Sequence, residues 1–177
     1  WNPPLRGGAA KRKKKPAPDS LIRTQDVLKA VDQDGNLVEI KPRRDLSGVY
    51  ALAPDIPDLH LGEQAKPFCK VGYGTSMFKI IDQYKRCFSN GVYIISVLLV
   101  NNKAIPRVRE RTKFIRDIEK RVHHLMKAAR YKPYLNSYVR GLPEWFTGLT
   151  IKNIRQIFRR VQAEYPDELT ALDAYQE

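Results

Sequence analysis

Four short segments carry side chains that could act together in catalysis. A phenol, an ammonium, a carboxylate and an imidazole are groups with which proteins move protons, stabilise anions and bind cations. The segments are "SGVYALA" (47–53) with Gly48 and Tyr50, "FCKVGYG" (68–74) with Lys70 and Gly72, "EKRVH" (119–123) with Glu119 and His123, and "PEWF" (143–146). They form one site only if the elements between them bring them together.

The pattern of apolar residues predicts three strands and two helices around these segments. The link between the first two strands has no helical pattern, so these strands should pair antiparallel. We therefore expect an α+β domain, a small three-stranded antiparallel sheet flanked by helices. The strands are expected at 47–53, 67–73 and 92–100, and the helices at about 76–88 and 107–130.

The remaining segments are expected to extend this domain, which would cover residues 45–165. Residues 1–19 combine proline, glycine and a basic block, and they should form a disordered arm. The extension over 20–44 should hold a helix at about 20–32, then a turn and the short strand "LVEI". A last amphipathic helix is expected at about 150–164, and residues 166–177 should be a tail.

The order of these segments resembles that of the GIY-YIG nuclease superfamily. The closest resemblance is to its branch in phages and large DNA viruses, where the second motif reads Lys-[Ile/Val]-Gly and a Glu-x-x-x-His helix precedes Glu-Trp-Phe. It covers about residues 47–150. It implies a three-stranded antiparallel sheet flanked by helices and hydrolysis of phosphodiester bonds in DNA with Mg²⁺ or Mn²⁺.

The resemblance also implies a role for each motif residue. Glu119 would hold the metal, and Tyr50 would activate the attacking water. Lys70 would lower the pKa of that phenol or stabilise the phosphorane. His123, one helical turn after Glu119, is more typical of a residue that packs the helix. The family carries an arginine on the helix after the second motif, and here Lys79 or Arg86 would replace it.

Each of these residues also has an ordinary structural interpretation. Tyr50 is typical of a strand aromatic in a core, and Lys70 of a cation at a strand edge. Glu119 is typical of a surface glutamate paired with a basic neighbour such as Arg116. The sequence leaves these alternatives open.

The charge of the chain favours a polyanionic partner. Lys and Arg number 32 against 19 Asp and Glu, which gives a net charge of +13. Such an excess binds phosphates and releases counterions. The tyrosine- and arginine-containing loop 131–140 leaves RNA binding as a weaker alternative. The candidate nucleic-acid contacts are Lys11, Arg12, Lys13, Lys14 and Lys15 in the arm and Arg109, Lys113 and Arg116 in the long helix.

These observations favour a metal-dependent DNA endonuclease. The alternative is a non-catalytic relative of the same fold that binds nucleic acid or serves as a minor virion component, in contact with other virion proteins. The two cysteines, Cys69 and Cys87, suggest no disulfide framework and fit a reducing compartment, such as a nucleus or viral factory, or a virion. No apolar run is long enough to span a membrane, and the oligomeric state stays open.

Overall fold

The described part of the chain is built on one antiparallel sheet whose strands differ in length. The computed structural model describes residues 27–54, 62–88, 91–128, 132–133 and 144–174. The strand order within these residues is β2-β1-β8-β5-β3-β4-β7-β6, and every neighbouring pair is antiparallel. The strands are β1 (Leu28–Val31), β2 (Leu37–Ile40), β3 (Gly48–Pro54), β4 (Cys69–Gly74), β5 (Val92–Val100), β6 (Lys132–Pro133), β7 (Trp145–Thr147) and β8 (Leu169–Ala174).

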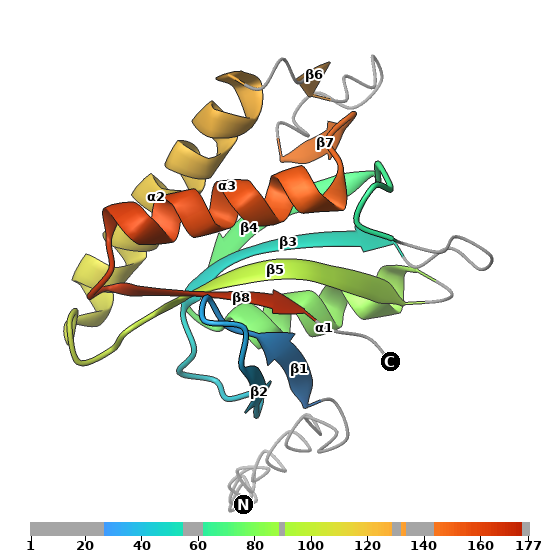
Figure 1. The fold of residues 1–177 in the computed structure, drawn as a ribbon. Helices are drawn as coiled ribbons and strands as arrows, with labels where there is room; N and C mark the ends of the chain where they lie inside the picture. The colour runs from blue at the N-terminus through green and yellow to red at the C-terminus, as the bar shows by residue number, and fades with distance from the viewer. Residues whose placement is uncertain (1–26, 55–61, 89–90, 129–131, 134–143, 175–177) are drawn as a thin grey trace, which may run out of the picture.

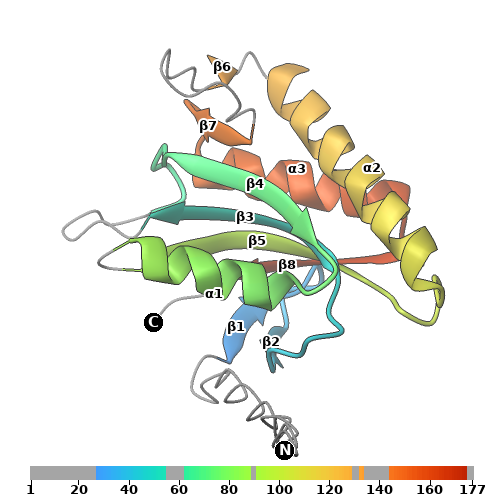
Figure 2. The same cartoon turned by 180° about the vertical axis from the view of Figure 1, so that it is seen from behind.

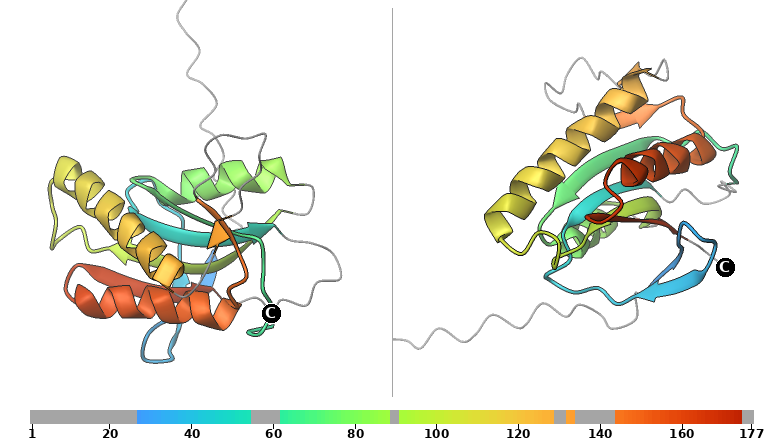
Figure 3. Two further views of the ribbon diagram at one scale, coloured as in Figure 1. Left: turned by 90° about the horizontal axis from the view of Figure 1, so that it is seen from above. Right: turned by 60° about the vertical axis from the view of Figure 1, so that its left-hand side comes forward.

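The helices cover both faces of the sheet. α1 (Met77–Cys87) lies on one face, and α2 (Val108–Ala128) and α3 (Ile151–Glu164) lie on the other. Figure 3 shows this layering from above, with the strands between α1 and the other two helices. Each face buries its own apolar cluster, because successive side chains of a strand point to opposite sides.

The prediction of a small three-stranded sheet is wrong, although the class remains α+β. The three predicted strands are adjacent, in the order β5-β3-β4, and β3 pairs antiparallel with β4 as expected. The sheet continues beyond them on both sides. On the β5 side it adds β8, β1 and β2, and on the β4 side it adds β7 and β6.

The strand β8 explains part of this error. Residues 166–177 were expected to be a tail, but Leu169–Ala174 form β8, whose first five residues pair with β5. The segment "LTALDA" is short and rich in leucine and alanine, which locally favour helix. Its strand conformation is imposed by the neighbouring strands β5 and β1, and such non-local pairing leaves little trace in a local pattern.

The helix predicted at 20–32 is wrong where the structure describes it. Residues Leu28–Val31 form β1, which pairs with β2 and β8, and residues 20–26 lie outside the described part. The predicted turn and the strand "LVEI" are confirmed. The carboxylate of Asp32 accepts the backbone N–H groups of Asp34 and Asn36, both at 2.9 Å, and Gly35 has a φ of +84° that favours glycine.

The other predicted elements are confirmed with small shifts of their ends. The helices expected at 76–88, 107–130 and 150–164 are α1, α2 and α3, and the apolar strand expected at 92–100 is β5. The basic arm at 1–19 lies outside the described residues.

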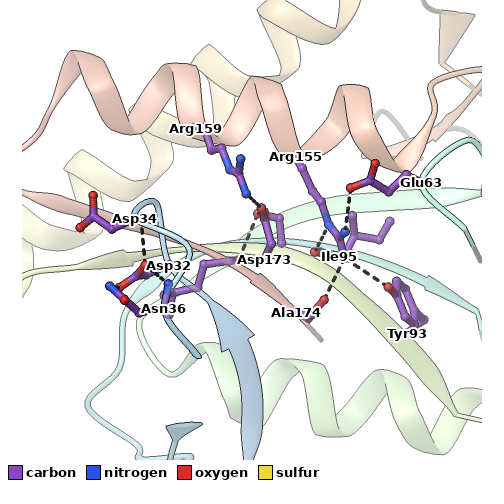
Figure 4. A network of polar contacts seen from close by, with 12 residues as sticks. Asp32, Asp34, Asn36, Glu63, Tyr93, Ile95, Arg155, Arg159, Asp173 and Ala174 are labelled. Carbon is purple, nitrogen blue, oxygen red and sulfur yellow. Dashed lines mark hydrogen bonds and ion pairs between the residues drawn. The ribbon is translucent and has the colours of Figure 1, made fainter. Parts of the chain in front are cut away.

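A polar network ties α3 to the middle of the sheet (Figure 4). The buried carboxylate of Asp173 on β8 accepts the hydroxyl of Ser96 at 3.0 Å and forms an ion pair with Arg159 of α3. Arg155, one turn earlier, donates to the carbonyls of Ala174 at 2.8 Å and Ile95 at 3.4 Å. Both oxygens of Asp173 therefore have partners, and the helix is fixed above strands β5 and β8.

Candidate functional site

The strand β7 pairs only with the first two residues of β4. The helix α2 lies along the rest of this outer edge. His123 of α2 donates through Nε2 to the carbonyl of Val71 at 3.3 Å. Two residues further along β4, the hydroxyl of Tyr73 accepts a hydrogen bond from Nε of Arg116, also at 3.3 Å. Glu119 lies three residues after Arg116 and four before His123, on the same side of the helix. It therefore faces the edge of β4 between these two contacts.

Tyr50 lies across Gly72 on the opposite strand. The two residues are directly paired in the β3–β4 ladder. A Cβ atom at position 72 would lie 2.6 Å from the phenol oxygen, so only glycine leaves room for this ring. The side chain is buried, as expected for a core aromatic. Burial raises the pKa of the Tyr50 phenol, and the charges of Tyr84, Glu144 and Glu119 raise it further. The phenol is therefore protonated at neutral pH.

The other motif glycine, Gly48, brings β3 close to β5. A Cβ atom at this position would lie 2.2 Å from the carbonyl oxygen of Leu98. No side chain fits there without moving backbone. Gly48 thus sets the spacing of the central strands and has no contact with the polar groups at the β4 edge among its described neighbours.

Lys70 is a buried cation with three partners. Its side chain is 4% exposed, and its ammonium forms an ion pair with the carboxylate of Glu144. The ammonium also lies over the rings of Tyr84, 5.0 Å from the centroid, and Trp145, 5.8 Å from the centroid. Burial works to lower the pKa of Lys70, but the interactions with Glu144 and Tyr84 outweigh it and raise that pKa. Lys70 is therefore charged and is not an exposed cation at a strand edge.

Glu119 is a buried carboxylate that lacks a partner at one oxygen. The residue is 8% exposed, and its Oε1 atom has no hydrogen bond within the described residues. Arg116, the partner expected for a surface glutamate, bonds to Tyr73 instead. Burial, followed by the charge of Glu144, raises the pKa of Glu119 to about 7, while Lys70 acts in the opposite direction. Glu119, Glu144 and Lys70 are thus close enough for their charges to interact.

An unpartnered carboxylate oxygen of this kind suits a divalent cation. Mg²⁺ prefers carboxylate oxygens and commonly keeps several water ligands. Within the described residues, no three His, Cys, Asp or Glu side chains gather into a metal-binding group. A cation on Glu119 would therefore complete its coordination with water or with phosphate oxygens. The residues fit such an ion with one protein ligand.

His123 packs against neighbouring residues of the core and the β4 edge. Its ring lies edge-on to Phe146 with centroids 4.9 Å apart, and its Nε2 atom serves the Val71 carbonyl. Burial lowers the pKa of His123, although the Val71 contact opposes this effect. A neutral imidazole that donates to a carbonyl holds α2 against β4. It thereby positions Glu119, one turn earlier on the same helix.

The two candidates for the arginine position do not join this site. Lys79 and Arg86 are both exposed on α1, and Arg86 pairs with Asp82 at 2.9 Å. None of the contacts described in the structure connects Lys79 or Arg86 to Tyr50 or Glu119. The structure therefore brings together four of the candidate residues, namely Tyr50, Lys70, Glu119 and His123. Lys79 and Arg86 lie apart from them.

A basic surface lies on the exposed side of α2. Arg109, Lys113 and Arg116 are exposed and are spaced four and three residues apart, so they share one side of the helix. Lys120 continues this row. The row leads to the turn that carries Glu119. The basic block Lys11–Lys15 lies outside the described residues.

Sequence reasoning missed Tyr84 as part of the site. Met77, Ile81 and Tyr84 follow one another at helical spacing, and all three belong to the apolar cluster between α1 and the sheet. That spacing indicates a core position and does not show that the ring lies against an ammonium. Trp145 stacks on Phe68 with centroids 4.5 Å apart and also faces Lys70.

Comparisons of this chain with protein-family models, curated proteins and solved structures find no match. The functional assignment therefore rests on the chain's own residues. Among the described residues, no helix combines the length and the apolar character that crossing a bilayer requires.

Proposed function

We propose that this chain is a metal-dependent DNA endonuclease of the GIY-YIG type. The observation that carries the proposal is the buried carboxylate of Glu119, whose Oε1 atom has no hydrogen-bond partner. Burying an unpartnered carboxylate oxygen is costly, and a divalent cation would remove that cost. The charges of Lys70 and Glu144 act on the same carboxylate, so a cation and a bound phosphate would meet here.

The order of the central elements supports the resemblance. The strand with the first motif, β3, lies between β5 and β4, and α1 connects β4 to β5. α2 follows β5 and carries Glu119. The additional strands lie outside this unit. They change the size of the sheet but leave the relative order of the four motifs as the resemblance implies.

Each side chain has a role that its chemistry allows. A divalent cation held by Glu119 would polarise the phosphate and stabilise the leaving oxygen. Lys70 supplies a permanent positive charge for the phosphate. Tyr50 has a raised pKa, so its phenol would donate a hydrogen bond rather than act as a base. His123 fixes the helix that carries Glu119.

The basic row on α2 would hold the duplex. Arg109, Lys113 and Arg116 can contact successive phosphates without reading sequence, and Lys11–Lys15 would add nonspecific affinity. A nucleus or a viral factory would provide both DNA and a reducing environment for Cys69 and Cys87, and a virion would provide DNA.

Plasmid nicking tests the proposal. With Mg²⁺ or Mn²⁺, the wild-type protein should nick supercoiled DNA, and Glu119→Gln should reduce the rate by about a hundredfold or more. Tyr50→Phe should reduce it less, by about tenfold to a hundredfold, since one hydrogen bond is lost. Asp117→Asn, an exposed change on the same helix, is the matched control. Equal rates in all four proteins would overturn the proposal.

A second candidate function is non-catalytic binding of DNA, as in a minor virion component. The ion pair between Lys70 and Glu144 favours it, because the cation is already neutralised. The exposed positions of Lys79 and Arg86 favour it as well. A protein that shifts the plasmid on a gel in every variant and leaves it intact with either metal would be this binding protein.

A further inference from the structure

We propose that the Lys70–Glu144 ion pair is an exchangeable anion site. In this proposal a phosphate oxygen replaces the Glu144 carboxylate on the Lys70 ammonium. The site would thus alternate between an internal anion, when no ligand is bound, and an external one. The identity of the external anion as a nucleic-acid phosphodiester rests on the proposed function. The exchange itself rests on the geometry of the pair.

The two partners differ strongly in exposure. The Lys70 side chain is 4% exposed, whereas that of Glu144 is 43% exposed. A buried ammonium needs an anionic or strongly polar partner, because an isolated charge in the interior is costly. A half-exposed carboxylate can turn into water at little cost. The pair can therefore lose Glu144 only if another anion takes its place.

Lys70 stays in position without Glu144. Its backbone is paired on both sides, with Leu52 of β3 and Trp145 of β7. The faces of Tyr84 and Trp145 hold the ammonium through cation–π attraction, and neither ring depends on Glu144 for its place in the apolar cluster. The cation is thus preorganised for whichever anion occupies the site.

The exchange requires rotation of one side chain only. The carbonyl of Glu144 accepts the N–H of Val71 at 2.8 Å, so the main chain at this position is tied to β4. The carboxylate can swing away from Lys70 while this bond stays in place. Glu144 would thus act as a positioning residue that controls access to Lys70.

The experiment compares Glu144→Gln with Glu164→Gln in the full chain. Glu164 pairs with Arg121 at 2.7 Å on the surface between α2 and α3, so its substitution makes the same change of charge away from Lys70. The first readout is the salt dependence of binding to a short DNA duplex without divalent cation. The second is the rise in melting temperature caused by inorganic phosphate. Lys70→Met is combined with each substitution.

Glu144→Gln should free Lys70 for an external anion. Its plot of log affinity against log salt should be steeper than that of Glu164→Gln by about 0.9, which corresponds to one added phosphate contact. Inorganic phosphate should raise its melting temperature more than that of the wild type. Lys70→Met should remove both differences. Because a buried methionine needs no anion, Lys70→Met alone should also fold and should lack the wild-type response to phosphate.

The outcomes separate this inference from the proposed function. Equal responses of Glu144→Gln and Glu164→Gln, or a Glu144→Gln response that persists with Lys70→Met, would overturn the anion site even if the protein cuts DNA. A response to inorganic phosphate that requires Lys70, in a protein that ignores DNA at low salt, would support the anion site and overturn the proposed function.

Discussion

Two buried carboxylates in this molecule differ in how completely they are satisfied. Asp173, under α3, has a partner for each oxygen: Ser96 donates to one and Arg159 to the other. Glu119, beside β4, has one oxygen without any partner among the described residues. Both residues are less than a tenth exposed. Burial alone therefore does not distinguish the two carboxylates, whereas the unsatisfied oxygen of Glu119 does.

The surroundings of the two carboxylates follow the same division. Around Asp173, polar groups close the β5–β8 ladder and attach a helix, which is a structural task. Around Glu119, the charge of Glu144 raises its pKa, and the charges of Lys70, Lys120 and Arg116 lower it. The polar groups of the first region satisfy one another, whereas the second keeps one carboxylate oxygen without a partner among the described residues.

Removal of Asp173 should cause the largest loss of stability. Asp173→Ala leaves Arg159 without its anion and takes one partner from the fully buried Ser96 hydroxyl. We expect a loss of about 3 kcal/mol in the free energy of unfolding, measured with urea, because the buried Asp173 carboxylate loses its hydrogen bonds with Ser96 and with the half-exposed Arg159. Asp167→Ala, the same change at an exposed position, should cost less than about 0.5 kcal/mol. A similar loss in both variants would remove the structural role of Asp173.

Crowding of the β4 edge should have an intermediate effect. Gly72→Ala places a Cβ atom 2.6 Å from the Tyr50 hydroxyl and 2.8 Å from its Cζ atom. We expect a loss of about 2 kcal/mol, typical of an overpacked core. Tyr50→Phe should restore only part of it, since the ring carbon remains. In Gly62→Ala, where the new Cβ meets nothing within 4 Å, stability should be unchanged within about 0.5 kcal/mol.

Local sequence patterns predict some elements of this fold and not others. The elements that were predicted correctly, such as α2 and β5, have long apolar patterns with one clear period. The strands β1 and β8 have short segments whose local preference is not extended, and only their pairing with distant strands determines them. The size of the sheet therefore could not be predicted from the pattern of its central strands.

The same limit applies to the candidate site. In the structure Glu119 lies close enough to Tyr50 and to Lys70 for electrostatic interaction. The state of Glu119 was not predictable, because it depends on Arg116 bonding to Tyr73, a residue far away in the sequence. The ring of Tyr84 over Lys70 likewise joins α1 to β4, and it follows from how those two elements pack.

The pH dependence of stability gives the most specific contrast. An acid whose pKa is raised to about 7 in the folded protein, from an ordinary value of 4.5, binds its proton more tightly when folded. Its contribution to stability is therefore complete below about pH 4.5 and is lost as the pH rises through 7. Glu119→Gln should equal the wild type at pH 4 and exceed it by about 3 kcal/mol at pH 8, measured by urea unfolding. Mg²⁺ should then stabilise the wild type at pH 8 and leave Glu119→Gln unchanged, because the cation binds the deprotonated acid. Asp117→Asn should follow the wild type at both pH values, and a Glu119→Gln profile parallel to the wild type would place Glu119 in the same satisfied class as Asp173.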